Sequence, residues 1–326
     1  MNTRKFGKTN KEVSEIGLGT WQLGTVWGEE FNKEEALKIL SSAEKNNITF
    51  IDTADVYNNG NSELTIGEYI KGKRDKFYIT TKCGRKLNPH TADMYIPEAI
   101  EKFINDSLER LKLDSLDLIL LHCPPTEVYE KKEIFDKLDE LKSIGKISAY
   151  GVSIEKVEEG LMAMKYDISA IEVIFNMFRL KPIEKLFPEA KKNNVAIIAR
   201  VPLASGLLTG KFNKDTKFGE NDHRTYNRNG AAFDKGETFS GIDYNTGLEA
   251  VEELKKVFNT DNLAPYAIKW TLMFDEVSVV IPGASKEKQV IENVLASELP
   301  NITDSQMKQV EEIYNKYFKN EIHNQW

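Results

Sequence analysis

Short apolar runs alternate with longer polar stretches of helical periodicity along the chain, and this alternation constrains the fold more than any other feature. The pattern is typical of parallel strands joined by crossover helices. Asn32 and Pro182 are typical helix-start residues. The expected helices include residues 33–45, 96–111, 132–144, 154–165 and 182–193. The expected strands are eight runs, residues 16–19, 49–52, 77–82, 116–122, 147–152, 170–174, 196–200 and 278–281.

Eight such units predict a closed (β/α)8 barrel of the α/β class, the TIM-barrel fold. The alternative is an open, doubly wound sheet, which normally carries a GxGxxG motif after its first strand. Gly17, Gly19 and Gly24 do not have that spacing. The sequence therefore favours the barrel.

Three additions to the barrel are expected. Residues 3–6 and 13–15 flank the turn-like segment 7–10, which predicts an N-terminal β-hairpin that closes the barrel bottom. Residues from about 212 to 246 are rich in Gly, Asn, Asp and Lys, and they predict a long loop over the barrel mouth. Extra helices should follow at the C-terminus. Because no domain boundary is evident, residues 1–326 are expected to form a single domain.

Composition restricts the partners of this chain. Its 326 residues are 40% hydrophobic and 29% charged, with a formal charge of −7 and a pI near 5.4. An acidic chain without basic, aromatic-rich runs gives nucleic acid no general reason to bind. Apolar runs such as 116–121 are too short to span a bilayer, so we expect a cytoplasmic protein with no membrane partner. No pattern indicates the oligomeric state.

The cysteines and histidines do not predict a metal centre. Cys83 and Cys123 lack CxxC spacing, which argues against a disulfide framework or a structural zinc site. The four histidines show no metal-ligand spacing either, so no metal is expected. Each cysteine follows a polar residue at a strand end, and strand alternation is expected to turn both thiols outward, beneath the helices.

Polar residues at the strand ends are the candidates for chemistry. Asp52 ends the second expected strand, Tyr57 lies in the loop beyond it, Lys82 ends the third strand and His122 ends the fourth. The active site of a (β/α)8 barrel lies at the carboxyl ends of its strands, so these four side chains should meet. A buried lysine favours the phenolate, so Lys82 is expected to lower the Tyr57 pKa from its reference value of about 10. Such a tyrosine suits proton transfer to a carbonyl that accepts hydride, with His122 as a second hydrogen-bond donor.

This ordered set resembles the catalytic tetrad of the aldo-keto reductases. The four residues lie in GTWQLG (19–24), FIDTADVY (50–57), TKCG (81–84) and LILLHCPP (118–125). The resemblance covers essentially the whole chain, because GVS (151–153), RVPLASGLLTGKF (200–212) and IPGASKEKQVIEN (281–293) resemble the cofactor segments of the family. It implies an NAD(P)H-dependent oxidoreductase that reduces the carbonyl of an aldehyde or ketone, reversibly.

The resemblance also implies a role for each residue. Tyr57 would be the general acid, Lys82 and Asp52 the pair that tunes it, and His122 the residue that orients the substrate carbonyl. The implied substrate pocket consists of Trp21, Trp27, Tyr57 and His122. The implied cofactor contacts are Gly19, Thr20, Trp21, Asp52, Ser153, Glu172, Arg200, Pro202, Leu203, Ser205, Leu207, Gly210, Lys211, Gly283, Ser285, Lys286, Gln289 and Asn293.

Three positions depart from the family pattern around the nicotinamide. Ile154 and Glu172 stand where members often have Asn and Gln for the carboxamide, and Glu172 is still able to accept a hydrogen bond from the amide NH2 group. Arg200 stands where many members stack an aromatic ring. Its planar guanidinium can stack, and we hypothesise that its positive charge disfavours the oxidised cofactor.

The choice between the two nicotinamide cofactors rests on residues near the expected last barrel helix. Lys286, Lys288 and Ser285 are suited to hold an adenosine 2′-phosphate, although Gln289 stands where some relatives place an arginine. The sequence thus favours NADPH and leaves NADH possible.

Two other functions remain open at this stage. Lys82 at a strand end also suits a Schiff-base aldolase. A cofactor-binding sensor or accessory subunit would keep the same cofactor segments with little turnover. No loop pattern identifies the substrate.

Overall fold

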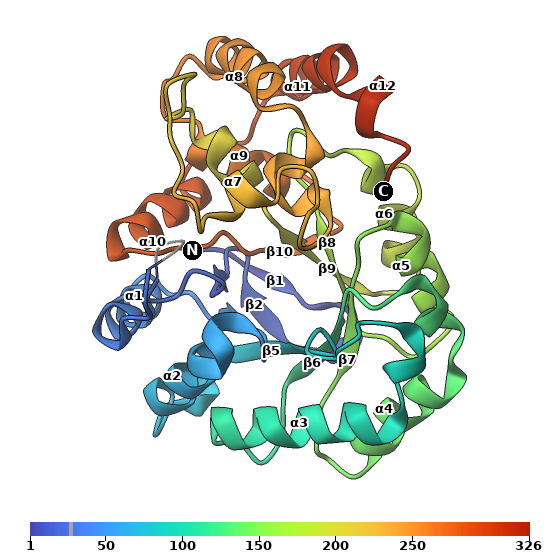
Figure 1. Ribbon diagram of the computed structural model, residues 1–326. Helices are drawn as coiled ribbons and strands as arrows, with labels where there is room; N and C mark the ends of the chain where they lie inside the picture. Colours follow the sequence, from blue (N-terminus) through green and yellow to red (C-terminus); the bar gives the residue numbers. More distant parts are fainter. Residues whose placement is uncertain (26–28) are drawn as a thin grey trace.

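The computed structural model describes residues 1–25 and 29–326. Its centre is a parallel eight-stranded sheet with the order β10-β9-β8-β7-β6-β5-β4-β3, surrounded by helices (Figure 1). The strands are β3 (Leu18–Gly19), β4 (Phe50–Asp52), β5 (Tyr78–Cys83), β6 (Leu118–His122), β7 (Tyr150–Ser153), β8 (Ala170–Ile174), β9 (Ala196–Arg200) and β10 (Val277–Val280).

The two edges of this sheet meet, which closes the barrel. Parallel bridges join Ile16 to Val280 and Gly19 to Gly283, and the Gly17 amide donates to the Val280 carbonyl at 2.8 Å. The predicted (β/α)8 barrel is therefore confirmed, with each expected strand present within a few residues of its predicted bounds.

Helices cover the outside of the barrel. The first begins as the sequence predicts, because the Asn32 side chain accepts a hydrogen bond from the Glu35 amide at 3.0 Å. The helix predicted at 182–193 instead starts as a 3-10 turn, Lys181–Ile183. The α-helices are α1 (Lys33–Lys45), α2 (Asn61–Tyr69), α3 (Pro97–Leu111), α4 (Lys132–Ser143), α5 (Val157–Ala163), α6 (Leu186–Lys192), α7 (His223–Tyr226), α8 (Tyr244–Phe258), α9 (Ala264–Leu272), α10 (Glu287–Val294), α11 (Asp304–Tyr317) and α12 (Lys319–Ile322).

The predicted N-terminal hairpin is present and contributes to the barrel interior. Strands β1 (Thr3–Lys5) and β2 (Glu12–Ser14) pair in antiparallel fashion. Phe6, just after β1, is fully buried, and its ring centroid lies 5.3 Å from that of Phe50 and 5.1 Å from that of Tyr78. These rings fill the interior near the amino ends of the strands, so the opposite end is left for a site.

The segment 212–246 differs from a plain loop. It contains α7 and two 3-10 turns, Lys235–Glu237 and Phe239–Gly241, before α8 begins at Tyr244. In Figure 1 this yellow-to-orange segment lies beside the barrel end, next to the C-terminal helices. Within the part of the chain that the structure describes, no helix is long and apolar enough to cross a membrane.

Candidate functional site

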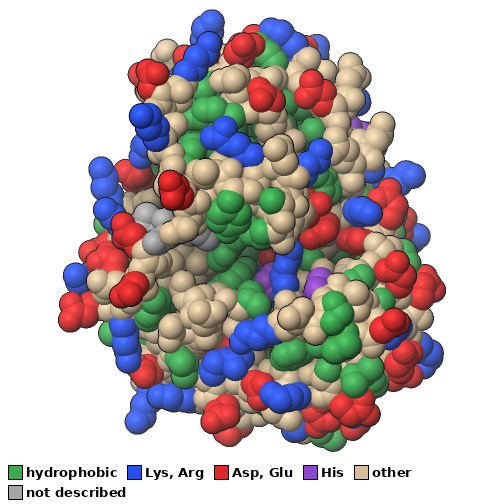
Figure 2. Space-filling model, viewed as in Figure 1, with side chains coloured by type: hydrophobic (Ala, Val, Ile, Leu, Met, Phe, Trp, Pro, Cys, Tyr) green, Lys and Arg blue, Asp and Glu red, His purple; other side chains and the backbone are tan. Residues whose placement is uncertain are grey.

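A cavity of about 640 Å³ lies at the carboxyl ends of the strands. The space-filling view shows this face hollowed near its centre, with histidine and basic side chains at the rim (Figure 2). The cavity is lined by fifteen of the predicted residues, namely Gly19, Trp21, Asp52, Tyr57, His122, Glu172, Arg200, Pro202, Leu203, Ser205, Lys211, Gly283, Ser285, Gln289 and Asn293.

Other predicted residues lie nearby without lining the cavity. Thr20 is buried and its hydroxyl donates to the Asp52 carbonyl at 2.8 Å. Leu207 is buried in the core between the barrel and its helices. The rest of this group is Lys82, Ser153, Gly210 and Lys286. Trp27 lies outside the described residues.

Lys82 joins the predicted acid–base residues. It is fully buried, and its Nζ donates to both Asp52 carboxylate oxygens at 2.6 and 2.7 Å, to the Thr53 carbonyl at 3.1 Å and to the Tyr57 hydroxyl at 3.3 Å. Burial lowers the Lys82 pKa, but the Asp52 and Glu172 carboxylates outweigh it and raise that pKa above its ordinary value. Lys82 therefore stays charged beside the phenol.

The expected lowering of the Tyr57 pKa is wrong for this structure. Burial raises the pKa of Tyr57 above its ordinary value, and the Asp52 and Glu172 carboxylates raise it further. Lys82 opposes this shift without reversing it. The hydroxyl therefore keeps its proton near neutral pH, which suits a proton donor.

His122 completes the group from the end of β6. Its ring lies edge-on to Tyr57, with the centroids 6.0 Å apart. Burial lowers the pKa of His122 well below its ordinary value, and the cationic Arg85 and Lys82 lower it further. A neutral imidazole at the cavity wall can donate one hydrogen bond to a carbonyl oxygen.

Glu172 and Arg200, the two unusual positions, belong to one buried ion-pair chain. A Glu172 carboxylate oxygen lies 3.4 Å from Lys82 Nζ, and the other lies 3.7 Å from Arg200 Nε. Arg200 Nη1 pairs with Glu237 at 2.5 Å, and Nη2 donates to the Ile154 carbonyl at 3.0 Å. The Ser153 hydroxyl donates to Glu172 at 3.3 Å.

These ion pairs contradict the premise of the hypothesis that Arg200 disfavours the oxidised cofactor. That hypothesis needs an excess positive charge at position 200, whereas Arg200 is paired with two carboxylates, Glu172 and Glu237. Ile154 takes part through its backbone carbonyl. Arg200 therefore brings no uncompensated charge to the cavity.

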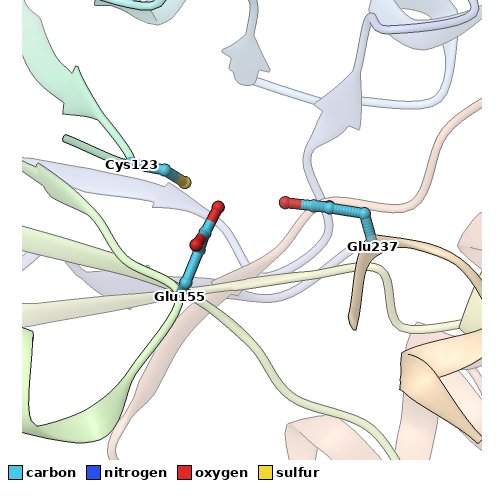
Figure 3. A group of neighbouring side chains, drawn as sticks. All are labelled: Cys123, Glu155 and Glu237. Atoms are coloured by element: carbon cyan, nitrogen blue, oxygen red, sulfur yellow. The ribbon is translucent and has the colours of Figure 1, made fainter. Parts of the chain in front are cut away.

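A group of possible metal ligands lies beside these ion pairs. It consists of Cys123, Glu155 and Glu237, with one potential ligand atom of each within 4.8 Å of the others (Figure 3). Burial raises the pKa of the Cys123 thiol to about 11, and metals bind the thiolate. The two carboxylates already pair with arginines, Glu237 with Arg200 at 2.5 Å and Glu155 with Arg85 at 3.7 Å. The cluster is thus better suited to hold guanidinium groups than a cation.

The two thiols do not share one environment. Cys83 is buried among the residues between sheet and helices, as predicted. Cys123 instead lies within 3.7 Å of Arg200 Nη2 and 3.6 Å of the Ser153 hydroxyl. Its φ of 47° breaks the extended backbone, so the strand alternation that supported the prediction no longer applies.

At the other end of the cavity, Gln289 caps the start of α10. Its side-chain oxygen accepts from the Ser285 amide at 2.7 Å, the Ser285 hydroxyl at 3.0 Å and the Lys286 amide at 3.1 Å. Lys211 Nζ lies 3.3 Å from Glu292, which also lines the cavity. These groups form a polar end, opposite the Tyr57 end.

Several lining residues were not predicted from the sequence. Arg85 follows β5, while His223, Phe233 and Glu237 come from the segment 212–246. None ends an expected strand, so the rule that located Asp52 did not select them. Arg85 lies two residues beyond Cys83 of the TKCG motif, so that motif was the signal that could have located it.

Comparison with known proteins assigns the family. A model of the aldo/keto reductase family matches residues 15–315. The chain belongs to this family of oxidoreductases. It is 29% identical to a Schizosaccharomyces pombe aldo-keto reductase whose name specifies NADP(+), over 95% of this chain and 90% of that protein.

Two further relatives differ in what their names specify. An NADH-specific methylglyoxal reductase of Escherichia coli is 30% identical over 92% of this chain and 94% of its own. The structure of a glycerol dehydrogenase from Gluconobacter oxydans superposes with a TM-score of 0.78 at 28% identity, over 98% of this chain and 97% of that one. This aldo-keto reductase therefore matches its relatives over nearly their full length.

Proposed function

We propose that this aldo-keto reductase transfers a hydride from NADPH to the carbonyl carbon of an aldehyde or ketone, with Tyr57 as general acid. The supporting observation is the Tyr57 hydroxyl, 3.3 Å from the buried Lys82 ammonium, on the wall of a cavity that His122 also lines. A carbonyl that gains hydride needs a proton at its oxygen, and Tyr57 holds one.

The residues present fit a nicotinamide cofactor. Glu172 lines the cavity, and a carboxylate can accept a hydrogen bond from a carboxamide NH2 group. The glycine-containing segment from Pro202 and the start of α10 supply backbone amides of the kind that bind phosphate groups. When bound, the reduced nicotinamide supplies the hydride.

The protein side chains divide the proton chemistry among them. Tyr57 gives its proton to the carbonyl oxygen, and the adjacent Lys82 ammonium stabilises the phenolate that remains. Asp52 holds Lys82 charged and in place through two hydrogen bonds. His122 donates a hydrogen bond to the same carbonyl oxygen. The reverse sequence oxidises an alcohol.

NADPH is the proposed donor because Lys286, Lys288 and Ser285 stand at the start of α10, where a 2′-phosphate is expected to bind. NADH is the competing cofactor, and the names of the two relatives specify one cofactor each. We further propose one domain, cytoplasmic location and a small-molecule substrate.

A turnover assay tests this function. Wild type should oxidise NADPH when offered members of a panel of aldehydes, ketones and sugars, with a lower KM for NADPH than for NADH. Tyr57→Phe should lose turnover by about a thousandfold while keeping its affinity for the cofactor. Trp21→Phe, another cavity-lining aromatic change, should lose far less. Cofactor binding with no turnover on any carbonyl would instead favour the sensor.

The Schiff-base alternative conflicts with the environment of Lys82. A nucleophilic lysine must be neutral, yet Lys82 Nζ has four oxygens within hydrogen-bond distance for its three N–H groups, and its pKa is raised. Borohydride with a carbonyl substrate should therefore leave no covalent adduct on Lys82.

A further inference from the structure

Lys82 is in contact with two carboxylates, which is one more than its own charge can balance. Asp52 accepts its hydrogen bonds at 2.6 and 2.7 Å, and Glu172 lies 3.4 Å from the same ammonium on the other side. Asp52 and Glu172 are each only 2% exposed. A buried carboxylate without a compensating positive charge is costly, and burial and the neighbouring Glu172 raise the pKa of Asp52 despite Lys82. A second cation beside Glu172 therefore favours the ionised form of both carboxylates.

Arg200 is placed to be that cation. Its Nε lies 3.7 Å from the Glu172 oxygen that also accepts from Ser153. The guanidinium is fixed from two further directions, by Glu237 at Nη1 and by the Ile154 carbonyl at Nη2. Two separate segments, those of Glu237 and Ile154, thus hold Arg200 beside Glu172.

We propose that Arg200 is a positioning residue, which balances the charge of Glu172 and so keeps the Lys82 ammonium on Asp52 and Tyr57. In this account Glu172 and Arg200 are a compensating pair. The glutamate is tolerated beside the acid–base group because the arginine, which it shares with Glu237, places a positive charge next to it. The proposal deepens the proposed function and rests on it only for the kinetic part of its test.

The geometry gives the consequence of losing Arg200. Glu172 would then keep Lys82 as its one cation within 4 Å among the described residues, and the Lys82–Tyr57 contact, already the longest of the four at 3.3 Å, would be the first to lengthen. A misplaced ammonium stabilises the phenolate less in the transition state. The rate of the chemical step should therefore fall more than cofactor binding weakens.

A double-mutant cycle tests the pair. Arg200→Met should lower kcat by about tenfold to a hundredfold, and Arg200→Lys, which keeps the positive charge, should lose less. Adding Glu172→Gln to Arg200→Met removes the uncompensated carboxylate and should recover kcat by about tenfold. Adding Glu237→Gln is the matched control, because it neutralises the other partner of Arg200 without touching Lys82, and it should not recover kcat.

A second measurement needs no turnover. The melting temperature of the cofactor-free protein should fall in Arg200→Met and rise again when Glu172→Gln is added, so the two changes are not additive. This melting-temperature cycle can be measured even if no carbonyl substrate is turned over. It therefore tests the Glu172–Arg200 pair independently of the proposed function. Additive melting temperatures, or a kcat defect that Glu172→Gln leaves unrepaired, would overturn it.

Discussion

Asp55, between Asp52 and Tyr57 in the chain, shows how a single buried residue can set a pH dependence. It is fully buried, and neither carboxylate oxygen has a hydrogen-bond partner among the described residues. Burial raises its pKa from 3.8 to about 7, although the Lys86 charge opposes the shift. Between these two pKa values, the Asp55 carboxyl is protonated in the folded state and ionised in the unfolded chain.

The sign of the effect follows from this difference. Between about pH 4 and pH 7 the folded state binds more protons, so Asp55 makes the free energy of unfolding fall as pH rises, by up to about 4 kcal/mol. Asp55→Asn should flatten that dependence and stabilise the protein most near pH 8. Unfolding midpoints measured across this range check it. Asp215→Asn, at an exposed position, is the control; parallel curves for Asp55→Asn and wild type would contradict the prediction.

The residue scale also shows what the sequence can predict. Asp52, Lys82 and His122 were predicted because each ends an expected strand, and strand ends meet at one edge of a barrel. The direction of the Tyr57 pKa shift was not predicted, because it depends on desolvation in the folded cavity and on Glu172 from a distant strand.

At the scale of elements, the C-terminal residue holds the segment that lines the cavity. Trp326 is 4% exposed, and its indole N–H donates to Asp234 at 2.9 Å. The Arg179 guanidinium lies 3.9 Å from its ring centroid. At Gly241 a Cβ would lie 2.3 Å from the indole, so the turn after Glu237 packs closely on the ring. Trp326 thus fixes the turns on both sides of Glu237.

Trp326→Ala should therefore loosen the segment 212–246. Amide exchange in that segment should speed up, and the KM for NADPH should rise by about tenfold, since about 1.4 kcal/mol of binding is equivalent to that factor. The kcat should change less. Trp326→Phe keeps the ring packing and loses the hydrogen bond. Its amide exchange rate in 212–246 and its KM for NADPH should therefore lie between those of wild type and Trp326→Ala. Exchange in 212–246 that is unchanged in Trp326→Ala would refute the role of the indole.

Elements with local signals were the predictable ones. Helix α1 was predicted with its observed bounds because Asn32 caps it and its buried residues recur with helical spacing. The start of α6 was misplaced because Pro182 initiates a 3-10 turn instead. Glu237 and Trp326 carry no local signal, since their partners lie far away in the chain.

At the scale of the whole molecule, the packed interior and the candidate active site lie at opposite ends of the barrel. The rings of Phe6, Phe50 and Tyr78 fill the interior near the amino ends of the strands, whereas the cavity opens at the carboxyl ends. The alternation of strands and helices was enough to predict this architecture, because few folds accommodate eight such units. The cavity floor follows from the strands, but its walls come from loops whose conformations depend on tertiary contacts.

The central claim is that hydride passes from the cofactor to a carbonyl carbon beside Tyr57, and isotope transfer tests it most directly. NADPH deuterated at both C4 positions, incubated with a carbonyl substrate that supports turnover, should give an alcohol with one deuterium at the former carbonyl carbon. Tyr57→Phe should give almost no labelled alcohol under the same conditions, although it binds the cofactor. An alcohol product without deuterium, or full label transfer by Tyr57→Phe, would contradict the account.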